Sequence, residues 1–382
     1  MRILFLTRYG RLGASSRQRC FLYLDALAAA GVESQLCPFL EDDYLRRLYS
    51  GSAASISGVF RAYASRLRAL LRIRRYDLLW LEKEALPWLP AWIELSVLKA
   101  AGAKMVVDYD DALFHAYDQH RSWWIRNLLG SKIDRIMASA DLVCVGNAYI
   151  GHRARAAQAR NISELPTVVD LRRYPVRRSG PASEDRPFTI GWIGSPVTSS
   201  YLDLLRPALA KLESRLRFRI VLIGAATGAL ADFPVELVTW SPETEATELA
   251  RCDVGVMPLP DLPWERGKCG YKLIQYMASS LPVVASPVGV NREIVVLGET
   301  GFLPPNDPDW ASSLLQLARE PALRQRMGAA GRRRVEEHYS LEVRGPELIE
   351  LLHSVAVPSS ELRPPAAMPH GAPAPTAQQG PF

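Results

Sequence analysis

The sequence is poor in cysteine and lacks the cysteine spacings that bind metals or form disulfide frameworks. Its 382 residues contain five cysteines, an odd number with no CxxC pair, so neither a zinc site nor a disulfide framework is predicted. Long apolar runs are also missing. No stretch approaches the roughly 18 to 20 apolar residues that span a bilayer, and the run after Met1 is too short for a signal peptide. These absences predict a cytoplasmic protein.

Two nucleotide-related signatures are absent as well. A strand pattern at Ile3 to Thr7 leads into a glycine loop and a helix pattern from near Phe21, but the GxGxxG fingerprint and its later acidic residue are missing. The net charge is +6 and the pI is near 9.1, yet aromatic residues do not interleave with the arginine-rich stretch, which argues against nucleic acid. The positive charge fits a nucleotide sugar or lipid headgroups.

The composition is that of an ordinary globular protein with a sizeable core. Apolar residues make up 48% and charged residues 23% of the chain, and the length predicts two domains of roughly 150 to 200 residues each. Short buried strands alternate with helical patterns in both halves, which predicts an α/β fold with two Rossmann-like domains facing a cleft.

A glycine-rich loop with two lysines is the strongest candidate for a binding site. Gly267 and Gly270 flank Lys268, and apolar spacing predicts a helix over 271–279 with Lys272 in its first turn. A lysine there opposes the helix dipole unless an anion binds. The loop therefore predicts a cradle for a phosphate or diphosphate. A surface loop with solvated lysines is the alternative.

Carboxylates follow another strand pattern that ends at Val107. Asp108, Asp110 and Asp111 come directly after it, with His115 four residues further on. Three carboxylates could hold a hard divalent cation. The two lysines could neutralise a diphosphate without metal, so we instead expect Asp110, Asp111 or His115 to hold hydroxyl groups of a ligand in the cleft. Turn and cap roles are the alternative.

The stretch 59–75 has the pattern of a basic amphipathic helix. It carries six arginines and no acidic residue, and its apolar residues recur at helical spacing. Such a helix can lie on anionic lipid. It can equally pack its apolar stripe on a sheet. The first possibility predicts a peripheral protein on the inner face of the membrane.

Three segments resemble the retaining glycosyltransferases of family 4, which have the two-Rossmann GT-B fold. They are KLIQYMASSLPVVAS from Lys272, GVNREIV from Gly289 and GETGFL from Gly298. The family pattern has two glutamates where this chain has Gly267 and Gln275. An amide such as Gln275 can still hydrogen-bond a ribose hydroxyl.

The resemblance implies a GT-B fold and a division of the chain. We expect an acceptor-side domain over 1–175, a nucleotide-sugar domain over 186–340, a final helix over 341–357 that crosses back, and a disordered proline-rich tail over 358–382. It also implies a metal-independent reaction without a cofactor. A sugar moves from a nucleotide-diphosphate donor to a hydroxyl of a carbohydrate or lipid-linked acceptor, with retention of configuration.

The loops after the strands and the resemblance together give the candidate site residues. Catalytic candidates are Lys268, Lys272, Asp110, Asp111 and His115; donor-binding candidates are Gly10, Gly13, Gly194, Ser195, Gly270, Tyr271, Gln275 and Glu293; acceptor-side candidates are Arg17 and Asn147. For Gly10 and Gly13, a plain tight turn is the alternative.

Two other functions remain open at this point. A nucleotide-sugar epimerase can use the same fold and would convert donor without any acceptor. A non-catalytic nucleotide-sugar-binding protein would bind donor and never turn it over, which the replacement of both glutamates makes a real alternative.

Overall fold

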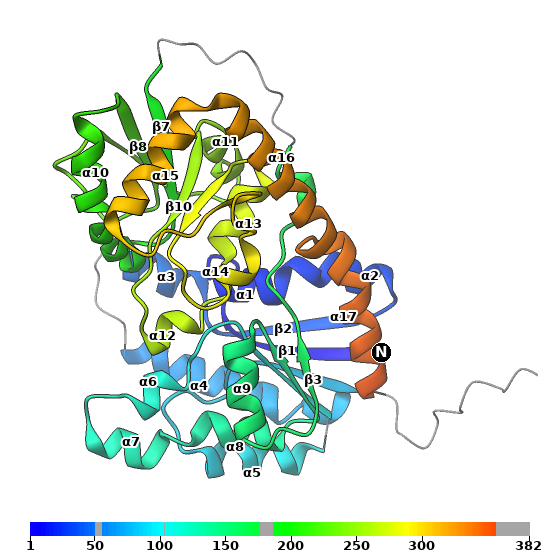
Figure 1. Ribbon diagram of the computed structural model, residues 1–382. Coiled ribbons are helices and arrows are strands. Elements are labelled where there is room, and N and C mark those ends of the chain that lie inside the picture. Colours follow the sequence, from blue (N-terminus) through cyan, green and yellow to red (C-terminus); the bar gives the residue numbers. More distant parts are fainter. Residues whose placement is uncertain (50–55, 103, 176–185, 357–382) are drawn as a thin grey trace, which may run out of the picture.

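The computed structural model describes residues 1–49, 56–102, 104–175 and 186–356, which form two α/β domains stacked one above the other (Figure 1). Each domain is built on a sheet whose paired strands are all parallel. The predicted α/β class and the two Rossmann-like domains are confirmed. The predicted disordered tail, 358–382, lies outside the described residues.

The N-terminal sheet has the strand order β2-β1-β3-β4-β5-β6. Alternate residues of its strands enter different apolar clusters: Leu79 and Leu81 of β3 belong to one, and Leu78 and Trp80 to the other. The sheet is thus buried on both faces, as its continuous apolar strands require. The strands are β1 Arg2–Tyr9, β2 Glu33–Leu40, β3 Leu78–Glu82, β4 Lys104–Tyr109, β5 Leu142–Val145 and β6 Ile162–Glu164.

The C-terminal sheet has the order β12-β11-β10-β7-β8-β9. Its strands are β7 Phe188–Ile193, β8 Phe218–Ile223, β9 Val235–Val238, β10 Val254–Met257, β11 Val283–Ala285 and β12 Gly301–Phe302. The winding direction reverses beside β7 here and beside β1 in the first sheet. Crevices at such reversals, at the carboxyl ends of the strands, are where open α/β sheets bind ligands.

Helices connect the strands and cover the sheets (Figure 1). In the N-terminal domain they are α1 Ala14–Arg19, α2 Leu24–Ala29, α3 Asp42–Tyr49, α4 Ile56–Leu70, α5 Ala91–Ala101, α6 His115–Asp118, α7 Trp123–Leu129, α8 Lys132–Ser139 and α9 Ala148–Ala156. In the C-terminal domain they are α10 Arg206–Glu213, α11 Glu245–Ala250, α12 Pro263–Arg266, α13 Tyr271–Ala278, α14 Asn291–Ile294, α15 Asp307–Arg319 and α16 Pro321–His338. Short 3-10 turns are η1 Phe21–Tyr23, η2 Ile73–Arg75, η3 Leu171–Arg173 and η4 Pro196–Leu205.

The last helix, α17 Leu341–Ala356, returns to the N-terminal domain and packs against α2 (Figure 1). Leu341, Leu348 and Leu352 join the apolar cluster that includes Phe5 and Trp80. At the start of α17, the Leu341 amide donates to the Val169 carbonyl at 2.9 Å. The two domains are therefore tied together by a helix as well as by their facing loops.

Two local expectations need correction. The first helix starts at Ala14, before Phe21, because Gly13 already serves as its N-cap residue with an extended backbone. In the basic helix α4, Arg66 is 1% exposed and donates to the Thr7 carbonyl. Arg66 therefore faces the sheet and cannot contact lipid. None of the described helices is long and apolar enough to cross a membrane.

Candidate active site

The lysine loop of the C-terminal domain is pressed against the N-terminal domain. Asn147 donates from Nδ2 to the carbonyls of Gly267 and Lys268, at 2.9 and 3.1 Å. The Cys269 thiol donates to the Asp110 carbonyl at 2.9 Å. Asn147 also caps α9 through its Oδ1, which accepts from the Ile150 amide. Asn147 is thus an interdomain clasp with both ends of its amide occupied, which leaves no free group for the predicted acceptor contact.

The backbone at the start of α13 explains two of the glycines in this loop. Gly270 is the N-cap residue with φ +65°, a left-handed conformation that favours glycine. At Gly267 an added Cβ would lie 2.4 Å from the Ala112 Cβ and 2.8 Å from its nitrogen. Gly267 is therefore the residue that lets the two domains meet, and a glutamate could not stand there in this arrangement.

Lys272 lies in the first turn of α13, as predicted. Its ammonium is 5.1 Å from the centre of the Trp192 ring of β7. Burial and the neighbouring charge of Lys268 lower the pKa of Lys272 to about 7. The protein offers this ammonium little negative charge, so a bound anion would strongly stabilise its charged form. The charge around Lys272 therefore favours the predicted phosphate cradle. The role of Lys272 in a reaction stays a prediction.

The carboxylates face these lysines from the other domain. Burial and Asp110 raise the pKa of Asp111, while Lys83, Lys268 and Lys272 oppose that rise. For Asp110, burial alone would raise the pKa, but Lys83 and Arg19 bring it below its ordinary value. Two neighbouring carboxyls with pKa values pushed apart can hold one proton between them.

Lys83 is a site residue that the sequence did not reveal. It directly follows β3, is 6% exposed and has a left-handed backbone with φ 68°. Its ammonium lies 2.9 Å from Asp110 Oδ1 and 3.7 Å from Asp111 Oδ2. A left-handed lysine is uncommon outside functional sites and tight turns. The only available signal was that a charged Glu-Lys-Glu run directly follows an apolar strand.

Asp108 takes no part in this cluster. It is fully buried and forms a two-pronged ion pair with Arg19, whose Nε and Nη2 lie 2.9 and 2.5 Å from its oxygens. The described residues contain no group of three or more His, Cys, Asp or Glu side chains arranged to hold a metal. Asp108 is thus a structural carboxylate that fixes α1 to β4.

His115 is held by neighbours within its own domain. Its Nδ1 lies 2.9 Å from Asp118 Oδ1 and its Nε2 lies 2.8 Å from the Tyr149 hydroxyl. Both ring nitrogens therefore already have protein partners. The catalytic role of His115 stays a prediction, but this geometry offers no free nitrogen to a substrate.

The glycine loop after β1 is shaped by packing. A Cβ at Gly10 would lie 2.4 Å from Asp42 Oδ1, and one at Gly13 would lie 2.3 Å from the Tyr9 Cβ. The Arg17 guanidinium stacks 4.7 Å from the ring centre of Trp240, and so bridges the domains. Its Nε is buried without a partner. Arg17, on α1 just after this loop, thus points between the domains.

The remaining donor candidates are distributed around α13 and β7. Tyr271 accepts a hydrogen bond from Gln18 of the first domain. Gln275 is 2% exposed and donates to the Tyr174 hydroxyl at 3.0 Å. Gly194 lies against Trp192, and Ser195 forms a capping box with Thr198 at the start of η4. Glu293 is exposed on α14, where burial and the charge of Glu164 raise its pKa.

A second unpredicted carboxylate borders the loop. Glu265 of α12 is 6% exposed, and its Oε1 accepts a hydrogen bond from the Tyr201 hydroxyl. Its Oε2 is buried without a partner. Burying a carboxylate oxygen without a hydrogen-bond donor costs free energy, so such an oxygen is normally paired with a donor. Glu265 lies two residues before Gly267, the position at which the resembled family has its first glutamate.

Comparison with known proteins agrees with this architecture. Residues 187–320 match the protein family described as Glycosyl transferases group 1. Sucrose-phosphate synthase from Thermosynechococcus elongatus superposes with a TM-score of 0.71 at 17% identity, covering 93% of this chain and 99% of that one. HepE from Anabaena, solved in complex with UDP, superposes with a TM-score of 0.69 at 17% sequence identity, covering 93% of this chain and 100% of that one. A glycosyltransferase from Rickettsia africae superposes with a TM-score of 0.66 at 14% sequence identity, covering 93% of this chain and 98% of that one. Among curated proteins the sequence has no match.

These findings define the fold and the family that its second half resembles. Residues 187–320, within the C-terminal domain, match the group 1 glycosyltransferases, and the whole chain has the two-domain GT-B architecture. The resemblance to such glycosyltransferases is confirmed at this level, and membership of family 4 in particular stays a prediction.

Gly267→Glu tests whether the close contact between the domains is needed. We expect this variant to keep both domains folded yet lose activity by about tenfold or more, because the new side chain overlaps Ala112 and overpacking costs about 1–3 kcal/mol. Small-angle scattering would show a more open molecule and a glycosyl-transfer assay the loss. Gly267→Ala should be intermediate. A fully active Gly267→Glu protein would contradict the inferred closure.

Proposed function

We propose that this protein is a retaining, metal-independent glycosyltransferase that takes a sugar from a nucleotide-diphosphate donor. One observation carries the proposal: Lys272 stands in the first turn of α13 with its pKa lowered to about 7 by burial and by Lys268. A diphosphate would relieve this charge repulsion and bind the free N–H groups of the helix start. HepE, which shares this fold, was solved with UDP-glucose, so UDP-sugars are the first donors to try.

The proposed chemistry uses fixed charge. As the bond from sugar to phosphate breaks, negative charge grows on the leaving diphosphate, and Lys268 and Lys272 stabilise it. The leaving phosphate takes the proton of the acceptor hydroxyl on the same face, which gives retention. Asp110 and Asp111, held by Lys83, stand opposite the lysines, where they would hold hydroxyls of the acceptor or of the reacting sugar.

Glu265 supplies the sugar contact that Gly267 cannot make. Its unpartnered Oε2 can accept a hydrogen bond from a hydroxyl of the donor sugar, while Tyr201 holds the other carboxylate oxygen in place. In this proposal the carboxylate of the resembled family is displaced by two residues. It makes room for the contact between Gly267 and Ala112.

A panel of nucleotides and nucleotide sugars tests the function. A true donor at 100 times its Kd should stabilise the protein by about 2.7 kcal/mol. Incubation of that donor with acceptor candidates should then release the nucleoside diphosphate. Conversion of the donor sugar without acceptor would favour the epimerase, and binding without any turnover would favour the non-catalytic protein.

Chelation tests metal independence. We expect transfer activity to survive exhaustive treatment with EDTA, because Lys268 and Lys272 supply the positive charge that a divalent cation would otherwise provide. Activity before and after chelation is measured on the same preparation. Loss of activity with EDTA and its return with Mn²⁺ would overturn this part of the proposal.

A further inference from the structure

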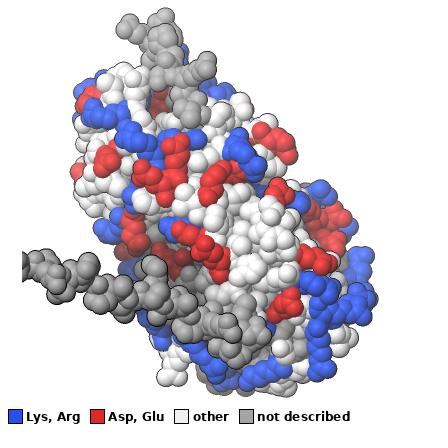
Figure 2. Space-filling model, turned by 90° about the vertical axis from the view of Figure 1, so that its right-hand side faces the viewer, with Lys and Arg blue, Asp and Glu red and all other residues white. Residues whose placement is uncertain are grey.

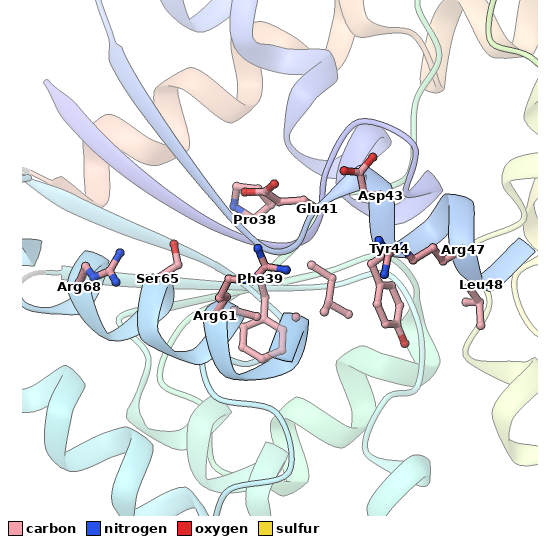
Figure 3. A pocket seen from close by; sticks show the side chains of 13 residues that line it. Pro38, Phe39, Glu41, Asp43, Tyr44, Arg47, Leu48, Arg61, Ser65 and Arg68 are labelled. Carbon is pink, nitrogen blue, oxygen red and sulfur yellow. The ribbon is translucent and has the colours of Figure 1, made fainter. Parts of the chain in front are cut away.

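A cavity of about 420 Å³ lies in the N-terminal domain between α3 and α4, at the end of β2 (Figure 3). Arg61, Ser65 and Arg68 reach into it from one side of α4, and Phe39 forms part of its wall. Glu41 stands at the end of β2 on the other side. No role has been assigned to this cavity so far.

The charges of the cavity favour an anion on one side. Among the described residues, no carboxylate pairs with Arg61 or Arg68, although both line the cavity. Arginine forks bind phosphate through two parallel hydrogen bonds. Glu41 and Tyr44, which both line the cavity, offer the two groups that recognise a sugar: an acceptor for its hydroxyls and an aromatic surface for its ring.

Helix α4 carries three distinct faces. Ala62, Arg66 and Leu70 are buried against the sheet. Phe60 and Leu67 of α4 and Leu71 directly after its end, at spacings of seven and four residues, are 72%, 45% and 84% exposed. At about 100° per residue, these three form one outward apolar stripe. Arg61 and Arg68 lie on the helix between this stripe and the cavity.

A second, smaller hollow borders the cavity along the loop after β1. The Gly10 amide donates to the Leu40 carbonyl, and the Leu12 amide donates to Asp42 Oδ1. The smaller hollow is lined by Gly10, Arg11 and Asp42, and it shares Pro38, Glu41 and Asp43 with the cavity. A molecule held by Arg61 and Arg68 therefore has a continuous surface along Pro38 and Glu41 to Gly10, in the loop that follows β1.

We propose that this cavity binds the phosphate-linked sugar of an acceptor anchored in a membrane by an apolar chain. The phosphate binds Arg61 and Arg68, the sugar lies against Tyr44 and Glu41, and the apolar chain leaves along the exposed stripe of α4 into the lipid. The proposal rests on the proposed function and names its acceptor class.

The charged and the apolar surfaces of this region both fit a membrane-anchored phosphate. Basic side chains gather along the lower end of the molecule, over the N-terminal domain (Figure 2), and α4 and α5 lie at that end (Figure 1). An apolar stripe bordered by arginines matches an interface of anionic headgroups and acyl chains. A soluble polysaccharide would need neither the stripe nor the unpaired arginines.

Decyl phosphate below its micelle concentration is the probe for the cavity. Titration calorimetry should show that Arg61→Gln with Arg68→Gln weakens its binding by about tenfold or more, which corresponds to the loss of charge-assisted hydrogen bonds. The matched control is Arg75→Gln with Arg121→Gln, which removes the same charge from exposed arginines elsewhere on this domain. This control should bind like the original protein.

Three further measurements decide between sources. Decyl glucoside, which is neutral, and inorganic phosphate, which has no chain, should each bind much more weakly than decyl phosphate. Phe60→Ser with Leu67→Ser should reduce sedimentation with vesicles of phosphatidylcholine and phosphatidylglycerol. Equal binding of decyl phosphate by the cavity variant and its control would overturn the proposal. So would equal binding of inorganic phosphate, which would indicate a plain anion site.

Nucleotide binding distinguishes a failure of this cavity proposal from a failure of the proposed function. UDP should bind the original protein and all three variants with equal affinity, because Lys268 and Lys272 are unchanged. Failure of UDP and every other nucleotide to bind the original protein would count against the glycosyltransferase proposal, whatever the result with decyl phosphate.

Discussion

Lys272→Ala should lower sugar transfer by about a hundredfold or more, the usual scale for removing one group that stabilises charge in the transition state. Alanine keeps the helix intact. Donor affinity should fall less than turnover, since Lys268 and the helix N–H groups still hold the ground-state charge. Steady-state kinetics with saturating acceptor separates the two effects.

The pH dependence gives the same lysine a second signature. Its pKa of about 7 in the free protein means that its ammonium is lost as the pH rises through neutrality. A bound diphosphate favours the charged form, so the affinity for UDP-glucose, whose diphosphate does not titrate in this range, should fall as the pH rises from about 6 to 8. Titration calorimetry across this range should also show proton uptake on binding. In Lys272→Ala this part of the pH dependence should disappear.

Charge matters here, but so does the shape of the group. Lys272→Arg should recover only part of the activity, because a planar guanidinium is longer and differently hydrated than an ammonium. Lys211→Ala, on the exposed side of α10, is the matched control and should be fully active. Near-full turnover by Lys272→Ala would mean that the loop binds no diphosphate.

Asp108→Asn should destabilise the N-terminal domain by about 3–5 kcal/mol, the cost of leaving one partner of a buried ion pair uncompensated. Arg19 and Asp108 are both fully buried, and Arg19 also donates to the Leu165 carbonyl. Urea unfolding followed by tryptophan fluorescence measures the shift. Added Mn²⁺ should not restore the loss.

Asp232→Asn is the control for this second prediction. Asp232 pairs with Arg206 on the surface, where the carboxylate is 74% exposed. Such pairs contribute about 0–1 kcal/mol, so the unfolding midpoint should barely move. A similar small shift for Asp108→Asn would show that the pair is not the structural element inferred here.

The fold could be predicted from the sequence because strands and helices are specified by patterns within short stretches of the chain. Apolar runs such as Leu78–Leu81 and Val283–Ala285 lie in strands buried on both faces, and the glycine loop before Tyr271 begins a helix as expected. Alternation of strands and helices then leaves few topologies. The lysines of this loop could be placed at a strand's carboxyl end for the same reason.

The missing parts of the site depend on contacts between distant segments. Nothing near Lys83 shows that it will meet Asp110, and nothing near Asn147 shows that it will clasp Gly267. The lipid-binding alternative for the basic helix placed Arg66 on the exposed surface, because helical periodicity treats every arginine as exposed. A buried hydrogen bond to the Thr7 carbonyl overrides that rule.

The clasp around the lysine loop has a consequence for turnover. Asn147 and Cys269 hold Gly267, Lys268 and Asp110 across the domain boundary, so the two domains can separate at this loop only when these hydrogen bonds break. In the proposed reaction, release of the nucleoside diphosphate through such an opening would be a step whose rate depends on the clasp and is independent of the sugar's chemistry. If this opening limits turnover, the donor with the fastest bond-breaking step need not be the donor with the highest kcat.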